Sequence, residues 1–218
     1  MPVPLESRVS TAVRASLAEA LSLVFPTWCA GCDELDVSLC GACAAALQPH
    51  PAARRLDGFE VRSALPFDGV AARVIRAYKQ EGRTGLARPL GAALAAAVGT
   101  VDADTVIVPV PSSRAAIRRR GYRVAELLAR RADLAPRRLL HPAAVAADQR
   151  ELGREARAAN VHGTLRAGPV AGLRVIVVDD VVTTGATLSE AVRVLRTAGA
   201  DVLRAATVAA TARRSPAA

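Results

Sequence analysis

The chain has 218 residues and a formal net charge of +9, and 51% of its residues are hydrophobic but only 3% aromatic. This length suffices for one α/β domain of ordinary size with a small appendage. No segment approaches the roughly 18 apolar residues of a membrane helix, which argues against membrane insertion. The charge permits binding to nucleic acid or another polyanion. A single lysine among 29 basic residues also fits the arginine-rich composition of a GC-rich genome, and the six scattered aromatic residues form no obvious stacking platform for single-stranded DNA.

The first predicted element is the apolar run LAEALSLVF at residues 17–25. It contains Glu19 and lacks the context of a signal cleavage site, so we interpret it as an amphipathic helix and not as an export signal. We therefore expect a cytoplasmic protein.

All four cysteines lie in the stretch CAGCDELDVSLCGAC, as two C-x-x-C pairs separated by seven residues: Cys29, Cys32, Cys40 and Cys43. Such tandem pairs are typical of tetrahedral Zn²⁺ sites, and Gly31 and Gly41 would let the backbone turn tightly around the metal. The alternative is a redox dithiol, which usually needs a single pair near the start of a βαβ unit. Four cysteine ligands leave no open position, so the zinc would be structural and would fold residues 27–45.

Residues 47–58 contain two prolines and show no periodicity. They are predicted to form a linker, which indicates a domain boundary near residue 50. Residues 59–69 then predict a strand that ends in a turn.

Residues 70–82 predict a helix with an apolar face that includes Val74 and Tyr78. A second face carries Arg73, Arg76 and Lys79. Taken alone, these charges indicate an ordinary solvated surface.

The apolar run at residues 105–110 predicts a buried strand, which Pro109 and Pro111 end because proline cannot donate to a ladder. A polar loop follows, with the residues Ser112, Ser113 and Arg114. The cluster RRRGYR at residues 118–123 precedes another helix. These arginines either solubilise a helix surface or surround a highly anionic ligand beyond the end of the strand.

Residues 147–165 are polar, charged and poor in aliphatic side chains. They predict either an ordinary solvated loop or a mobile, partly helical segment.

The stretch VIVVDDVVTTGATL at residues 175–188 predicts a strand, a loop and a helix in succession. The continuous apolar run 175–178 is the pattern of a strand buried on both faces of a parallel sheet. Thr187 or Ser189 is the expected N-cap of the helix, which Gly199 ends. Residues 200–210 predict a further strand.

The predicted loop after residue 178 combines two kinds of chemistry. Asp179 and Asp180 offer carboxylate acceptors, whereas Thr183, Thr184, Gly185 and Thr187 offer donors at the N-terminus of a helix. In an open α/β sheet such a loop faces the ligand crevice, so a ribose 5-phosphate fits both parts. A Walker B strand is the weaker alternative, because the chain has no G-x-x-x-x-G-K-[ST] motif, and it has no G-x-G-x-x-G motif for a dinucleotide.

Residues 175–188 resemble the phosphoribosyl-pyrophosphate (PRPP) binding motif of type I phosphoribosyltransferases, and the whole chain is similar to the competence-associated ComF family. The resemblance implies an α/β fold with a type I phosphoribosyltransferase-like parallel sheet flanked by helices, preceded by a small N-terminal four-Cys zinc module. The expected domains are an N-terminal helix with the zinc module at residues 1–50 and the phosphoribosyltransferase-like domain at residues 51–218.

The resemblance also implies roles for individual residues. Residues that would bind PRPP, with Mg²⁺, are Asp179, Asp180, Val181, Val182, Thr183, Thr184, Gly185, Ala186, Thr187, Ser112, Ser113, Arg114 and Lys79. The loop with the two serines would hold the pyrophosphate. A flexible lid would include Gln149, Leu152, Arg157 and Asn160, which match the family pattern Q-x-x-L…R-x-x-N. The chain has Arg123-Val124 where the family commonly has Asn-Gln, so a contact made by that pair is changed here.

The implied activity is transfer of the phosphoribosyl group to an unknown acceptor with release of pyrophosphate. No dedicated general base is needed, and the sequence indicates none. The alternative is a non-catalytic protein that binds PRPP, a nucleotide or single-stranded DNA during competence and DNA uptake.

Overall fold

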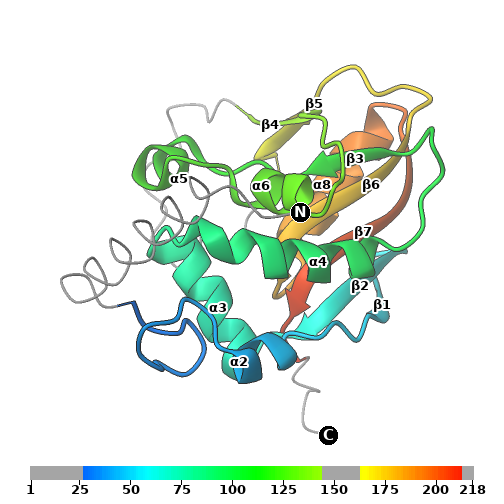
Figure 1. The fold of residues 1–218 in the computed structure, drawn as a ribbon. Coiled ribbons are helices and arrows are strands. Elements are labelled where there is room, and N and C mark those ends of the chain that lie inside the picture. The colour runs from blue at the N-terminus through cyan, green and yellow to red at the C-terminus, as the bar shows by residue number, and fades with distance from the viewer. Residues whose placement is uncertain (1–26, 144–162, 213–218) are drawn as a thin grey trace, which may run out of the picture.

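The computed structural model describes residues 27–143 and 163–212, which form an α/β fold (Figure 1). Its main sheet has the strand order β1-β2-β7-β6-β3. The strands are β1 (Ala52–Leu56), β2 (Phe59–Pro66), β3 (Val106–Pro109), β6 (Arg174–Val182) and β7 (Asp201–Ala210). All neighbouring pairs are parallel except β1 and β2, which form an antiparallel hairpin at one edge. The fold class is therefore the one that the sequence predicts.

Helices cover both faces of this sheet (Figure 1). One face packs against α3 (Gly69–Gln80), α4 (Ala87–Val98) and α6 (Val124–Arg131), and the other against α8 (Ala186–Thr197). In β6, Ile176 and Val178 join the first core, whereas Val175 and Val177 join the second. This alternation explains the continuous apolar run of a strand buried on both faces.

The smaller elements lie around the main sheet. They are α2 (Gly41–Ala45), the 3₁₀ turn η1 (Thr84–Leu86), α5 (Arg114–Arg120) and the antiparallel pair β4 (Leu140–Pro142) and β5 (Leu165–Ala167). Within the described residues, none of the helices has the length and apolar character needed to cross a membrane. The predicted helix at 17–25 lies outside the described residues.

Two boundaries differ from the prediction at the motif 175–188. Strand β6 continues to Val182, so Asp179 and Asp180 belong to the strand and not to a loop. The extension comes from the long partner β7, which pairs Asp179 with Thr207 and Val182 with Ala210. Helix α8 begins at Ala186 with Gly185 as its N-cap, so the prediction of a Thr187 or Ser189 cap is wrong.

The predicted linker at residues 47–58 contains the edge strand β1. Its turn to β2 is formed by Asp57 and Gly58, which have φ angles of 44° and 81°. Both residues have the left-handed backbone conformation, which is typical of a tight two-residue hairpin turn. In β1 only Leu56 is fully buried, so the strand lacks the apolar pattern that would have revealed it.

Candidate functional site

A cleft of about 200 Å³ lies where β3 and β6 end at the same edge of the sheet. Its polar and charged lining comes from three separate parts of the chain: Lys79, Ser112, Ser113, Arg120, Asp179, Asp180 and Thr187. Six of these seven residues are among those that the sequence singled out for PRPP. Because the carboxyl ends of parallel strands share one edge, segments more than 60 residues apart in sequence, as from Ser113 to Asp179, meet here.

The acidic pair is held by a lysine from the end of α3. Lys79 Nζ lies 2.5 Å from Asp180 Oδ2, and the Asp180 side chain is only 8% exposed. The backbone N–H of Asp180 donates to Asp179 Oδ1 over 2.8 Å. Burial and the neighbouring Asp180 charge raise the pKa of Asp179 well above its ordinary value, and Lys79 only partly opposes this. The cleft thus presents two hydrogen-bonding carboxyl groups beside one cation.

The loop after β6 leads into the N-terminus of a 12-residue helix. Thr183 and Thr184 are exposed, and Thr184 Oγ1 accepts from the N–H of Ala186 over 3.4 Å. The first N–H groups of a helix have no partner within it, and together with the helix dipole they attract anions. Thr187 lies in the first turn and lines the cleft, so this end of α8 suits a phosphate.

Gly185 is required for the shape of this loop. It has a φ of +91°, and a Cβ there would lie 2.2 Å from Leu56 Cδ2 of β1. The hairpin also holds the helix through Ser189 Oγ, which donates to Asp57 Oδ2 over 2.5 Å. The edge strand that the sequence did not reveal therefore supports the loop. Within the motif, Val182 is buried in the strand, and Val181 and Ala186 are half-buried.

The loop after β3 contributes its residues unequally. Ser112 and Ser113 line the cleft, and Ser113 Oγ caps α5 by accepting from the N–H of Ala116 over 3.2 Å. Arg114 is exposed and lines a second, adjoining cavity instead of the cleft.

Arg120 is a cleft residue that sequence reasoning did not single out. Its Nε donates to the carbonyl oxygen of Lys79 over 2.6 Å, and the hydroxyl of Tyr122 donates to the carbonyl oxygen of Tyr78. These bonds tie the end of α3 to the last residue of α5 and to the segment that follows it. The cluster RRRGYR was recognised as a whole, but only the fold distinguishes Arg120 from its exposed neighbours Arg118 and Arg119.

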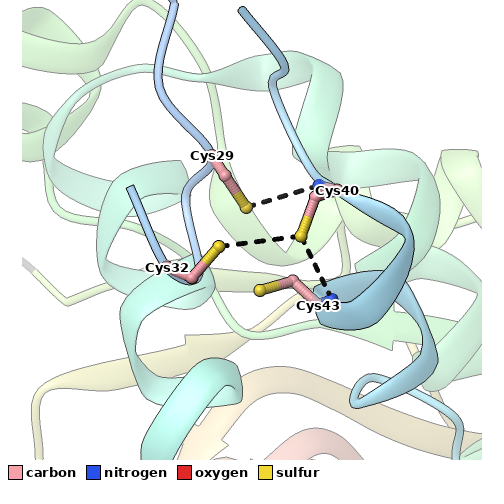
Figure 2. Close-up of side chains that lie close together, drawn as sticks. All are labelled: Cys29, Cys32, Cys40 and Cys43. Carbon is pink, nitrogen blue, oxygen red and sulfur yellow. Dashed lines mark hydrogen bonds between the residues drawn. The ribbon is translucent and has the colours of Figure 1, made fainter. Parts of the chain in front are cut away.

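The four cysteines form one cluster at the N-terminal end of the described chain (Figure 2). Their Sγ atoms all lie within 4.8 Å of one another, and Cys32 Sγ and Cys40 Sγ are 3.6 Å apart. Zn–S bonds of 2.3 Å give an S–S separation of about 3.8 Å in a tetrahedron. The cluster thus fits a closed zinc site of the predicted kind.

Backbone N–H groups support the sulfur atoms. Cys40 N and Gly31 N point at Cys29 Sγ, at 3.3 and 3.4 Å. Burial raises the pKa of the Cys29 thiol, but these N–H groups more than offset it and lower the pKa to about 6. A Cβ on Gly31 would lie 2.4 Å from Cys43 Sγ, whereas nothing lies within 4 Å of one on Gly41. The close approach around the sulfurs therefore requires Gly31, and the expected need for Gly41 is not seen.

The cysteine cluster packs on the helix that carries Lys79. Arg73 of α3 pairs with Asp33, and Arg83 donates to the carbonyl oxygens of Trp28 and Ser38 over 2.7 and 2.8 Å. Ala30 belongs to the same core as α3 and α4. The predicted lid residues Gln149, Leu152, Arg157 and Asn160 lie outside the described residues.

Comparisons with known proteins support part of the prediction made from the sequence. Residues 115–217, which are 103 of the 218 residues, match the model of the phosphoribosyl transferase domain. The match includes residues 179–187 but begins after Ser112, Ser113 and Arg114. No curated protein sequence matches the chain.

The chain also aligns with solved structures, among them an amidotransferase, a UMP synthase and a phosphoribosyltransferase. Glutamine PRPP amidotransferase from B. subtilis is 27% identical, with a TM-score of 0.37, over 56% of this chain and 25% of that chain. UMP synthase from Leishmania donovani is 17% identical, with a TM-score of 0.37, over 78% of this chain and 31% of that chain. An adenine phosphoribosyltransferase is 18% identical, with a TM-score of 0.38, over 77% of this chain and 89% of that chain.

This chain spans about a quarter of the length of the amidotransferase. The domain match supports phosphoribosyl transfer chemistry in general, and none of the comparisons identifies the ComF family. The C-terminal half of the chain thus carries a match to the phosphoribosyl transferase domain.

Proposed function

We propose that the protein binds PRPP with Mg²⁺ and transfers its phosphoribosyl group to an acceptor, releasing pyrophosphate. The observation that carries this proposal is the single cleft that gathers two acids, Lys79, two serines and the N-terminus of α8. A ribose with an anion at each end needs this combination, because phosphates need donors and ribose hydroxyls need acceptors.

The ligand would have one orientation in the cleft, because its 5-phosphate, ribose and pyrophosphate need different partners. Its 5-phosphate would be held by the loop and first turn at residues 183–187, and its ribose hydroxyls would donate to Asp179 and Asp180. Its pyrophosphate would lie near Ser112 and Ser113, within the reach of Lys79 and Arg120. Arg114, which the resemblance implies as a PRPP ligand, would serve only at the far end of the pyrophosphate.

The residues present fit a magnesium ion held mainly by the substrate. Mg²⁺ is usually bound by one or two carboxylates together with substrate phosphates and water, and the two aspartates supply carboxylates in the cleft. Bound there, the ion would neutralise charge on the pyrophosphate. The four cysteines would hold a structural Zn²⁺.

In the reaction, a nucleophilic atom of the acceptor forms a bond to C1 of the ribose while the bond from C1 to the pyrophosphate oxygen breaks. The electron pair leaves with the pyrophosphate, and the acceptor loses its proton to solvent. Asp179 and Asp180 orient the ribose, and Lys79 and Arg120 stabilise the leaving charge. No described residue needs to act as a general base.

Three further assignments, of the family, the domain boundary and the cellular location, are also proposals. The motif and the tandem cysteine pairs support membership of the ComF family. The change from the cysteine module to the hairpin β1-β2 supports a domain boundary near residue 50. The third is a location in the cytoplasm, where reducing conditions keep cysteine thiols available to bind zinc.

The test is release of pyrophosphate from PRPP in the presence of Mg²⁺ and a pool of acceptors. Wild type should release pyrophosphate only with an acceptor, and Arg120→Ala should be slower by at least tenfold. Arg119→Ala is the matched control, since it removes the same charge from the same helix outside the cleft. No release with any acceptor, together with salt-sensitive binding of single-stranded DNA, would favour a non-catalytic binding protein.

A further inference from the structure

A second cavity, of about 590 Å³, adjoins the cleft on the far side of the loop after β3. It lies between the end of β3, helices α5 and α6, and the β4-β5 pair, and it shares Val110, Pro111 and Ser112 with the cleft. Its charged lining comprises Arg114, Arg123, Arg138, Arg166 and Glu126, and the imidazole of His141 lies beside them. The function proposed above makes no use of most of these residues.

The carboxylate of Glu126 fixes the arginines on one wall of the cavity. Its side chain is only 8% exposed, and Arg138 binds it with two donors, at 2.6 and 2.8 Å. Arg123, which also lines the cavity, adds a contact of 3.8 Å, and Arg130, which lies outside the lining, adds one of 3.0 Å. The guanidinium of Arg138 lowers the pKa of Glu126, so this group is charged at neutral pH.

One carboxylate cannot neutralise the guanidinium groups of both Arg123 and Arg138, which line the cavity. The wall formed by Glu126 with its arginines therefore keeps a surplus of positive charge, and Arg114 and Arg166 add to it. Guanidinium groups whose orientation is already fixed lose little freedom when they bind an anion, and their planar donors match phosphate oxygens.

Apart from Ser112, the rest of the lining is apolar. Ile117, Leu140 and Pro142 contribute aliphatic surface beside the arginines. The volume falls in the usual range for small-molecule sites, of roughly 300–1,000 Å³. A ligand that fills this cavity thus needs one strongly anionic end and one flat or apolar end.

We propose that this cavity binds a nucleotide, with its phosphate on the arginines held by Glu126 and its base against the apolar wall. The role of the nucleotide rests on the proposed function. An acceptor must approach C1 from the face opposite the leaving pyrophosphate, whereas this cavity adjoins Ser112 on the pyrophosphate side. The nucleotide is therefore an effector that acts on PRPP binding through the shared loop.

The experiment is calorimetric titration of the full chain with AMP, GMP, CMP, UMP and inorganic pyrophosphate as separate probes. At least one nucleotide should bind wild type, and Arg138→Ala and Arg166→Ala should each weaken it about tenfold or more, since each removes a charged hydrogen bond. Arg119→Ala should bind as wild type does. Asp180→Asn, which alters only the cleft, should retain nucleotide binding.

Each other outcome overturns the inference in a recognisable way. Nucleotide binding that Asp180→Asn abolishes would place the nucleotide in the cleft. Binding of pyrophosphate alone would show an inorganic anion site. If PRPP binds but no nucleotide does, this inference fails and the proposed function stands. If a nucleotide binds but PRPP does not, the proposed function fails and the nucleotide site stands.

Discussion

Replacement of Gly31 by alanine should disrupt the cysteine cluster through a single added carbon. The new Cβ would lie 2.4 Å from Cys43 Sγ and 2.9 Å from Cys43 Cβ. Carbon atoms in contact are normally about 3.5–4.0 Å apart, so the sulfur has to move by roughly 1 Å or more. Metal–ligand distances hold within about 0.2 Å, so Cys43 cannot keep its place around a zinc ion.

The expected loss of zinc affinity is at least the roughly 10–100-fold that follows from disturbing groups around a metal site. Competition against a chromophoric chelator measures this affinity. Gly41→Ala is the matched control, because it lies in the same module and its Cβ meets nothing within 4 Å. Equal zinc affinity in Gly31→Ala and wild type would refute the reasoning and the close contact on which it depends.

Two further predictions test the cleft. Gly185→Ala should weaken PRPP binding more than tenfold, because φ is +91° and the Cβ would lie 2.2 Å from Leu56 Cδ2. Adding Leu56→Ala to the same chain should restore part of the PRPP affinity, because it removes the clash but not the backbone strain. In Asp179 the folded-state pKa is raised above 3.8, so wild type loses stability as pH rises above about 4 through the folded pKa. Asp179→Asn lacks this loss, and melting curves should show its advantage in Tm growing from pH 4 to pH 8. A constant difference would contradict the raised pKa of this carboxyl group.

The central part of the sheet could be predicted from the sequence because burial on both faces leaves a continuous apolar run. Residues 175–178 show this pattern, and they pair with β3, which ends opposite Val178. That shared edge is a property of parallel sheets, so the meeting of Asp180 with Ser112 follows from the sequence once both strands are recognised.

Other features depend on partners far away in the chain. Strand β6 extends through Asp179 only because β7 continues beside it, and Lys79 reaches Asp180 only because α3 packs on the sheet. The local sequence around these residues indicates neither of these two contacts. Likewise, a Cβ on the N-cap Gly185 would clash with Leu56, which lies over 100 residues earlier in the chain.

Helix α4 was not predicted because its sequence is nearly uniform. Of its residues, alanine and leucine make up most, and both sides of the helix are covered, by the sheet and by α6. A helix buried in this way has no polar face to produce a clear period. Gly91 marks the closest approach, since a Cβ there would lie 2.8 Å from the carbonyl carbon of Arg131.

The most direct test of the proposed function is calorimetric titration of PRPP with Mg²⁺ into wild type and into the Asp179→Asn/Asp180→Asn variant. We expect micromolar-range binding to wild type, lost in the variant, with no loss of thermal stability, because Lys79 and these acids serve the ligand and not the core. Absence of PRPP binding to wild type, or equal binding to both proteins, would contradict the assignment of this cleft to PRPP.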